Sequence, residues 1–337
     1  MLIRLKPARP TLLAQFGAGL LLIFASLLPI TAAPIKIAYS DWPGWVAWEI
    51  ALQKGWLKEA GVDAEFVWSA YGPSMEAFAA GKVDAVMITN GDALVTGANG
   101  AKSVMILLTD YSNGNDMIVA GPGVKSIADL AGKKIGLEVG VVEHLLLVRA
   151  LKKAGLTEAD VTLINTPTDQ TPALLASGQV AAIGAWQPVA GEALATVPGA
   201  HAIFTSADEI GLIYDGLAVS PQSLAERRSD WLKVLSVWDR IIRYIRDPAT
   251  QGSAIEIMSA RSGSDHKQYA RMISGTRFLT LEEGFQKMTA KATAGLGSLK
   301  VSSLIANDFN LKNHVYPASQ EVDSYFDARL ATEALAR

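Results

Sequence analysis

One short phrase occurs twice in this sequence, and the repeat limits the folds that the chain can adopt. Residues 80–85 (AGKVDA) recur as residues 177–182 (SGQVAA), with a helical segment before each copy and an apolar strand after it. Similar apolar strands, Ile35–Tyr39 and Lys134–Leu137, open the two repeated segments. The repeat predicts two similar α/β lobes, and a cleft between two lobes is a preferred place for a small ligand.

Apolar strands alternate with helical segments as far as about residue 213. Such alternation is typical of a parallel sheet with helices on both faces. From Ser220 onward the pattern is helical, and Thr280 with Glu283 forms a capping box at the start of one of these helices. Trp231 and Trp238 are predicted to lie in the core. We expect this C-terminal segment to complete the first lobe and to brace it.

The N-terminus has the pattern of a secretory signal peptide. Basic residues precede a long apolar run at 12–28, and small residues at 31–33 suit a cut after Ala33. An uncleaved membrane anchor is the alternative. The chain has no cysteine, which excludes disulfides, thiolate chemistry and a lipid anchor on the mature protein. We therefore expect a mature protein in the periplasm.

The charge of the mature chain argues against a nucleic-acid partner. Removal of three basic residues with the signal peptide leaves 27 of the 30 Lys and Arg against 33 Asp and Glu, a formal charge of −6. Nucleic-acid binding proteins are typically basic.

Several motifs occur in a familiar order. They are IKIAY with QKGWLKEAGV within 35–62, AAGKVDA at 79–85, KSIADLAGKKIG at 125–136, AWQP at 185–188 and DGLAV at 215–219. Together they resemble the nitrate/sulfonate/taurine-type substrate-binding proteins of ABC importers. The resemblance implies a type II periplasmic-binding-protein fold, with two similar lobes, a hinge and a ligand cleft between them.

The resemblance also implies a division of the chain and a set of partners. We expect a signal peptide at 1–33, the first part of lobe 1 at 34–119, lobe 2 at 120–213, and the return to lobe 1 with the C-terminal helical region at 214–337. Hinge strands are expected near 116–120 and 213–217. The implied partners are a small ligand and a membrane permease with its cytoplasmic ATPase, and we expect a monomer without a cofactor.

The loops at the carboxyl ends of the predicted strands indicate the class of ligand. Ligands of open α/β sheets bind at these ends. The loops hold no Lys or Arg, but they hold many acids and aromatic residues: Asp41, Asp92, Asp116, Glu138, Glu143, Asp169 and Asp215, with Trp42, Trp45, Trp68, Tyr71, Tyr111, Trp186 and Tyr214. Carboxylates and aromatic faces attract cations. The sequence thus favours a small nitrogenous cation or zwitterion; a sulfonate, taurine or nitrate-type anion, or a pyrimidine thiamine precursor, is the alternative.

Ten residues are predicted to contact the ligand: Asp41, Trp42, Trp45, Tyr71, Asn90, Glu138, Trp186, Gln187, Tyr214 and Asp215. Asn90 and Gln187 end equivalent strands of the repeat, so each lobe could supply one amide. Asp41 and Glu138 likewise follow equivalent strands and place a carboxylate on each side of the cleft. We interpret Asp92 as a helix cap, and Glu143 and His144 as solvated positions on a helix.

An enzyme is the rival class, and the sequence offers little for it. The histidines have no metal-ligand spacing, and a Gly-x-Ser-x-Gly elbow and a phosphate-binding loop are absent. Related folds make a thiamine pyrimidine precursor, but they resemble a cysteine-containing pattern that this chain lacks. A third class, a partner that presents its ligand to a membrane sensor, cannot be separated from transport by sequence.

Overall fold

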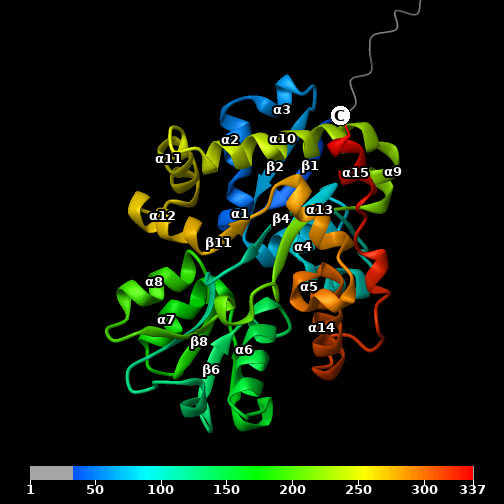
Figure 1. Cartoon of the computed structure of the whole chain (residues 1–337). Helices are drawn as coiled ribbons and strands as arrows, with labels where there is room; N and C mark the ends of the chain where they lie inside the picture. The colour runs from blue at the N-terminus through cyan, green and yellow to red at the C-terminus, as the bar shows by residue number, and fades with distance from the viewer. Residues whose placement is uncertain (1–32, 337) are drawn as a thin grey trace, which may run out of the picture. The chain divides into compact units, whose positions relative to one another are not determined.

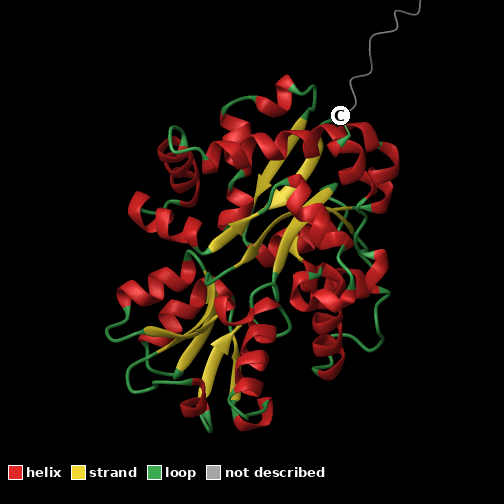
Figure 2. Cartoon of the chain, viewed as in Figure 1, coloured by secondary structure: helices red, strands yellow, loops and turns green. Residues whose placement is uncertain are grey.

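The computed structural model describes residues 33–336, and the predicted signal peptide lies outside them apart from Ala33 (Figure 1). From Pro34 onward the chain forms a unit with two mixed β-sheets (Figure 2). The first sheet has the order β11-β4-β10-β3-β1-β2 and the second the order β7-β6-β8-β5-β9. We call the parts built on them lobe 1 and lobe 2.

The two sheets share a strand pattern. In lobe 1, β1 (Ile35–Tyr39) pairs in parallel with β2 (Ala64–Trp68) and β3 (Ala85–Thr89). In lobe 2, β6 (Lys134–Leu137) pairs in the same way with β7 (Thr162–Asn165) and β8 (Ala182–Trp186). This repetition confirms the fold class predicted from the sequence.

Antiparallel strands complete each sheet, which the alternation of strands and helices in the sequence did not indicate. β10 (Tyr214–Val219) lies antiparallel to β3 and to β4 (Val104–Ser112), and β11 (Thr276–Phe278) pairs with β4. β5 (Asp116–Ala120) lies antiparallel to β8 and to β9 (His201–Thr205). We expected β5 at the end of lobe 1, and it pairs within the second sheet.

The helices lie on both sides of the sheets (Figure 2). Three short helices follow β1, and Gly55 between the last two lies in the left-handed region at φ 70°. Lobe 1 begins with α1 (Pro43–Val46), α2 (Trp48–Gln53), α3 (Trp56–Glu59), α4 (Tyr71–Ala79) and α5 (Asn90–Ala98). Lobe 2 carries α6 (Val142–Lys153), α7 (Thr171–Ala176) and α8 (Val189–Thr196).

The C-terminal segment is helical, as predicted, apart from the short strand β11. It comprises α9 (Pro221–Glu226), α10 (Arg228–Arg246), α11 (Gln251–Ser262), α12 (His266–Ser274), α13 (Leu281–Thr289), α14 (Leu299–Lys312) and α15 (Arg329–Leu335). Short 3-10 segments occur at Ile127–Leu130, Glu158–Asp160, Thr168–Gln170, Ser206–Glu209, Ala292–Gly297 and Val322–Ser324.

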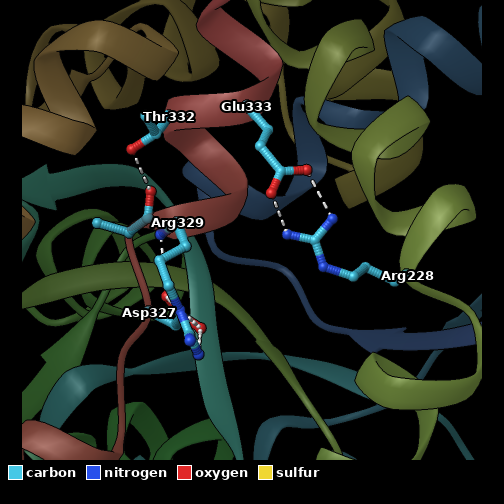
Figure 3. Close-up of polar contacts among 6 residues, drawn as sticks. Arg228, Asp327, Arg329, Thr332 and Glu333 are labelled. Atoms are coloured by element: carbon cyan, nitrogen blue, oxygen red, sulfur yellow. Dashed lines mark hydrogen bonds and ion pairs between the residues drawn. The ribbon is translucent and has the colours of Figure 1, made fainter.

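Tryptophans anchor α10 on lobe 1. Trp231 and Trp238 are fully buried, which confirms their predicted place in the core, and the Trp238 ring lies 5.1 Å from that of Trp48 on α2. The predicted capping box of Thr280 and Glu283 is present at the start of α13. At the chain end, Arg228 on α10 makes a two-pronged contact with Glu333 on α15 (Figure 3). None of the described helices is long and apolar enough to cross a bilayer.

Candidate ligand cleft

Side chains of both lobes border a small, largely filled space, which we call the deep pocket. It lies at the carboxyl ends of β3 and β8 and the amino end of α6. Its walls are Trp42, Trp45, Tyr71, Thr89 and Asp215 from lobe 1, with Asp116, Val142 and Trp186 from lobe 2. Residues from both sheets thus face the same space.

Aromatic rings form one continuous wall of the deep pocket. The ring centroids of Trp42 and Trp45 are 6.5 Å apart, and those of Trp45 and Tyr71 are 5.1 Å apart. Trp186, at the end of β8 in lobe 2, meets Tyr71 edge-on at 5.6 Å and 87°. The wall therefore crosses from one lobe to the other and presents π-faces suited to a flat or cationic ligand.

Buried acids surround this wall, and we call them the carboxyl cluster. They are Asp92, Asp110 and Asp215 from lobe 1, with Asp116 and Glu143 from lobe 2, and each is at most 3% exposed. None of the five forms an ion pair with a Lys, Arg or His of the described chain. Buried charges in proteins are normally paired, so this arrangement is costly without a compensating cation.

The cluster is joined to the aromatic wall by hydrogen bonds. Trp42 Nε1 donates to Asp110 Oδ1 at 2.9 Å, and the Tyr71 hydroxyl donates to Asp92 Oδ2 at 2.7 Å. The backbone N–H of Val142, from lobe 2, lowers the pKa of the Asp92 carboxyl group. The hydrogen bonds of Asp110 and Asp92 thereby fix the orientation of two rings of the wall.

Burial shifts the titration of all five acids upward. It raises the pKa of Asp92 to about 6, and the pKa values of Asp110 and Asp116 to about 7. Burial, followed by the charges of neighbouring acids, raises the pKa values of Glu143 and Asp215 well above their usual range. Several members of the cluster therefore hold a proton near neutral pH.

Four acids of the cluster form two pairs, and the two carboxyl groups of a pair can share one proton. Asp215 lies beside Asp110 and Glu143 beside Asp116, each pair within hydrogen-bond reach. Two carboxyl groups form a hydrogen bond only when one of them holds a proton. As ionised groups, Asp116 Oδ2, Asp215 Oδ2 and both Glu143 oxygens have no donor among the described residues.

Two glycines let the backbone approach the cluster closely. A Cβ on Gly44 would lie 1.8 Å from Asp110 Oδ2, so only glycine leaves room for that carboxyl group beside α1. A Cβ on Gly216 would lie 2.3 Å from the Leu107 carbonyl oxygen. Gly216 sits at a register shift between β10 and β4, as in a β-bulge.

The predicted site residues fall into three groups. Trp42, Trp45, Tyr71, Trp186 and Asp215 line the deep pocket. Asp41 and Glu138 line a wider opening above it, the outer cleft, together with Tyr71, Trp186 and Asp169 and without a Lys or Arg. Burial raises the pKa of Asp41. Glu138 accepts a hydrogen bond from the Thr168 hydroxyl at 3.1 Å.

The remaining three predicted residues lie away from the deep pocket. The Asn90 amide donates to Ser302 and Ser303 on α14 at 2.9 and 3.0 Å and accepts from the Tyr214 N–H at 3.0 Å. The Tyr214 hydroxyl donates to the Leu296 carbonyl oxygen at 2.8 Å.

Gln187 lines a separate groove between α8 and α12. The structure therefore does not bring the amides of Asn90 and Gln187 together on one ligand position.

Some residues of the cluster were missed or misread in the sequence. Glu143 and His144, expected to be solvated, are 0% and 1% exposed, so that expectation was wrong. Asp92 was expected to cap its helix, but Thr89 is the N-cap and accepts from the Asp92 N–H at 3.1 Å. Asp110 was not recognised as a site residue from the sequence, because it follows an apolar run within a strand.

The fold agrees with comparisons to known proteins. A family profile described as NMT1/THI5 like matches residues 43–247 of the 337. A protein of Brucella abortus named as a binding protein is 34% identical over 177 residues, 52% of this chain and 54% of that protein. A Haemophilus influenzae protein whose name assigns it to thiamine biosynthesis is 32% identical over 182 residues, 51% of this chain and 55% of that protein. The chain spans about half the length of the curated relatives it matches.

Solved structures share the fold at low sequence identity. The periplasmic aliphatic sulphonate binding protein SsuA of Escherichia coli has a TM-score of 0.71 at 19% identity, over 88% of this chain and 92% of that one. The periplasmic nitrate-binding protein NrtA of Synechocystis has a TM-score of 0.73 at 13% identity, over 91% and 89%. The desulfurization enzyme DSZB has a TM-score of 0.65 at 16% identity, over 90% and 99%.

These findings settle the family. The repeated sheets are those of periplasmic binding proteins, as the fold of SsuA and NrtA shows. The resemblance to the nitrate/sulfonate/taurine-type group, noted from the motifs, is confirmed by the profile match together with the fold of these neighbours. The profile match covers well over half of the chain, and the chain belongs to the NMT1/THI5-like family.

Proposed function

We propose that this chain is the periplasmic ligand-binding component of an ABC importer, and that its cleft captures a small pyrimidine-type compound. Capture would hand the ligand to a membrane permease driven by a cytoplasmic ATPase. The observation that carries the proposal is the deep pocket, where an aromatic wall and buried carboxyl groups face the same space. We further propose that the protein acts as a monomer and binds without turnover.

A pyrimidine suits both features of the pocket. Its flat ring can stack on Trp45, Tyr71 or Trp186, and a stacked aromatic pair contributes about 0.5–1.5 kcal/mol beyond the area it buries. Its ring nitrogens and amino substituents are hydrogen-bonding groups at the ring edge. A protonated carboxyl group can donate to such a nitrogen, and an ionised one can accept from such an amino group. Asp116 and Asp215 line the pocket and supply both kinds of group.

The names of the relatives favour the alternative ligands of the sequence analysis over a simple cation. They include binding proteins for sulfonate and for nitrate, and a protein assigned to thiamine biosynthesis. Among these alternatives the pocket favours the pyrimidine. A sulfonate or nitrate requires donors such as Arg, Lys or a helix N-terminus, and neither the deep pocket nor the outer cleft is lined by a Lys or Arg.

A sulfonate-type anion remains the second candidate function, because the SsuA fold covers nearly the whole described chain. The amino end of α6 faces the deep pocket through Val142 and could supply backbone donors. An anion there would meet Asp92, Asp116 and Glu143 at close range, and like charges in a buried site repel strongly.

Hinge closure is the proposed mode of capture. The lobes are joined by the segments 113–115 and 206–213, which lead into β5 and β10. A ligand that contacts Tyr71 in lobe 1 and Trp186 in lobe 2 would bind the closed form better than the open form. Only such a difference in affinity shifts the population toward closure.

A thermal-shift screen of the chain from residue 34 onward tests the proposal. The compounds would be aminopyrimidines, pyrimidine, guanidine, alkylamines, alkanesulfonates and nitrate. A ligand at 100 times its Kd adds about 2.7 kcal/mol to the free energy of unfolding, which gives a clear rise in Tm. Stabilisation by aminopyrimidines supports the proposal. Stabilisation by sulfonates or nitrate alone would replace the pyrimidine with the second candidate and leave the binding function in place.

A further inference from the structure

We propose that the deep pocket takes its ligand as a cation, a flat amidinium-like group held between Asp116 of lobe 2 and Asp215 of lobe 1. The inference rests on the proposed function and specifies the charge state of the bound molecule. The chemical class is a protonated aminopyrimidine, in which a ring nitrogen and the amino group form an amidinium-like edge with N–H donors. Neutral rings of the same shape are excluded by this inference.

The positions of the two aspartates carry the first step. Asp116 stands opposite Trp186 in the β5–β8 pair, and Asp215 stands opposite Thr89 in the β10–β3 pair. All four of these residues line the deep pocket. A carboxyl group from each lobe therefore borders the same aromatic space.

The Oδ2 atoms of these two aspartates provide the second step of the argument. As ionised groups, Asp116 Oδ2 and Asp215 Oδ2 are buried and have no donor among the described residues apart from the proton that each carboxyl group shares with its neighbouring acid. Both side chains belong to residues at most 3% exposed, so bulk water does not solvate them. A buried acceptor without a donor is costly, and an N–H group of the ligand would relieve the cost.

The charges around the pair carry the third step. Asp215 faces Asp110, Asp116 and Asp92, and Asp116 faces Asp92 and Glu143. The other titratable groups facing the cluster are Glu138, beside Asp92 and Glu143, and Tyr71 and Tyr269, beside Asp92 and Asp110. Glu138 is an acid and the two tyrosines are phenols, so none of these three groups brings a positive charge.

Closure without a cation would therefore bring acids of the two lobes together. Either protons or a cationic ligand must neutralise them. The hydrogen bonds within the Asp110–Asp215 and Asp116–Glu143 pairs need one proton each, and the charges that stay on the pairs and on Asp92 are still unbalanced. A cation between Asp116 and Asp215 offsets part of this negative charge and contacts both lobes at once, so closure would depend on the charge of the ligand.

Matched pairs of probes test the inference by calorimetry. Benzamidinium is compared with its neutral isostere benzamide, and acetamidinium with acetamide. We expect each amidinium to bind at least tenfold more tightly than its amide at pH 7.5. Because benzamidinium keeps its charge, its affinity should rise severalfold from pH 5.5 to pH 8 as the cluster loses protons. At pH 6 its binding should release protons, seen as a dependence of the measured heat on the buffer.

Variants separate a specific site from general acidity. Asp116→Asn and Asp215→Asn keep the shape of each side chain, and each should reduce the amidinium preference at least tenfold. Asp308→Asn removes an exposed acid on α14 whose partner is Lys312, and it should leave the preference unchanged. A preference that survives both pocket variants would overturn the inference.

The outcomes also distinguish this inference from the proposed function. Aminopyrimidines that bind together with amidinium ions, while amides do not, support both. Benzamide or pyrimidine binding as tightly as the charged probe overturns the cationic form and leaves the pyrimidine function standing. Binding of sulfonates or nitrate alone, or of none of the nitrogenous probes, overturns both.

Discussion

Asp215 and Asp110 lie directly opposite each other on the antiparallel strands β10 and β4, at 2% and 0% exposure. Like charges opposite each other across a sheet destabilise it, so the pair must share a proton or meet a cation. The Trp42 indole and the Thr109 hydroxyl donate to Asp110 at 2.9 Å each. This makes Asp110 the more easily ionised partner and leaves the proton on Asp215.

The first prediction concerns pH. The pKa values of Asp110 and Asp116 rise to about 7 on folding and that of Asp92 to about 6, so the folded chain holds more protons than the unfolded chain between about pH 4 and pH 7. The contribution of these groups to stability is fully present below their unfolded pKa and is lost as the pH rises through the folded values. Without ligand, chemical unfolding should show a free energy of unfolding at least about 1.4 kcal/mol higher at pH 5 than at pH 8, the equivalent of one pKa unit.

The Asp110→Asn variant provides the control for this prediction. It keeps an acceptor for Trp42 and removes one buried charge, so it should flatten the pH dependence and stabilise the chain at pH 8 by about 1–3 kcal/mol. An unchanged pH profile in the variant would show that the cluster does not govern it.

The second prediction is a Gly44→Ala substitution. The new Cβ would lie 1.8 Å from Asp110 Oδ2 and 2.4 Å from its Cγ, so the carboxyl group must move and its bond to Trp42 must weaken. We expect a loss of about 1–3 kcal/mol in stability from overpacking, and at least tenfold weaker ligand binding, since Trp42 lines the pocket.

Gly252→Ala is the matched control, because nothing lies within 4 Å of its added Cβ on α11. It should raise the free energy of unfolding by about 0.4–1 kcal/mol and leave ligand affinity unchanged. Equal effects of the two substitutions on binding would contradict the close approach described for Gly44.

The sequence was sufficient for the architecture. The repeat at 80–85 and 177–182 predicted two lobes, because each strand–helix–strand unit needs a similar apolar pattern to cover one sheet. Aromatic residues next to the strand ends, such as Trp42 and Trp186, were predicted to contact the ligand. The reason was that side chains directly after a strand lie at the edge of the sheet where ligands bind. Five of the ten predicted residues line the deep pocket.

Long-range pairing explains what the sequence did not predict. Asn90 is bonded to Ser302 and Ser303, more than 200 positions away, and no local pattern announces that α14 returns there. Asp110 and Glu143 look like ordinary strand and helix positions, and contacts with residues distant in the sequence bury them. Their role depends on tertiary packing that a single sequence does not display.

The third prediction compares two buried tyrosines. Tyr71→Phe keeps the ring of the aromatic wall but removes the hydroxyl that donates to Asp92 at 2.7 Å and accepts from the Thr89 N–H at 3.2 Å. The ionised Asp92 carboxylate then lacks one hydrogen-bond donor, so the pKa of Asp92 should rise further. The free energy of unfolding at pH 8 should fall by about 1–3 kcal/mol. Ligand affinity should fall less than in Asp215→Asn, because the ring remains.

Tyr269→Phe serves as its control, since the Tyr269 hydroxyl is buried without a hydrogen-bond partner among the described residues. Removal of an unsatisfied hydroxyl should leave stability unchanged or raise it slightly. Denaturant unfolding of the two variants at pH 8 measures the contrast, and a larger loss for Tyr269→Phe would refute it.

The fourth prediction concerns the contact that holds the C-terminal helix. Arg228 Nη1 and Nη2 donate to Glu333 at 2.6 and 2.5 Å, and Arg329 pairs with Asp327 at the start of α15 (Figure 3). The side chains of Arg228 and Glu333 are 41% and 47% exposed, so solvent screens the pair. A double-mutant cycle with Arg228→Ala and Glu333→Ala should give a coupling energy of at most about 1 kcal/mol, which decreases with added salt.

Hydrogen exchange in α15 should become faster in either variant, because the helix loses an anchor to α10. Ligand affinity should not change, since α15 does not line the cleft; a weaker affinity in Arg228→Ala would mean that packing at the chain end is coupled to closure.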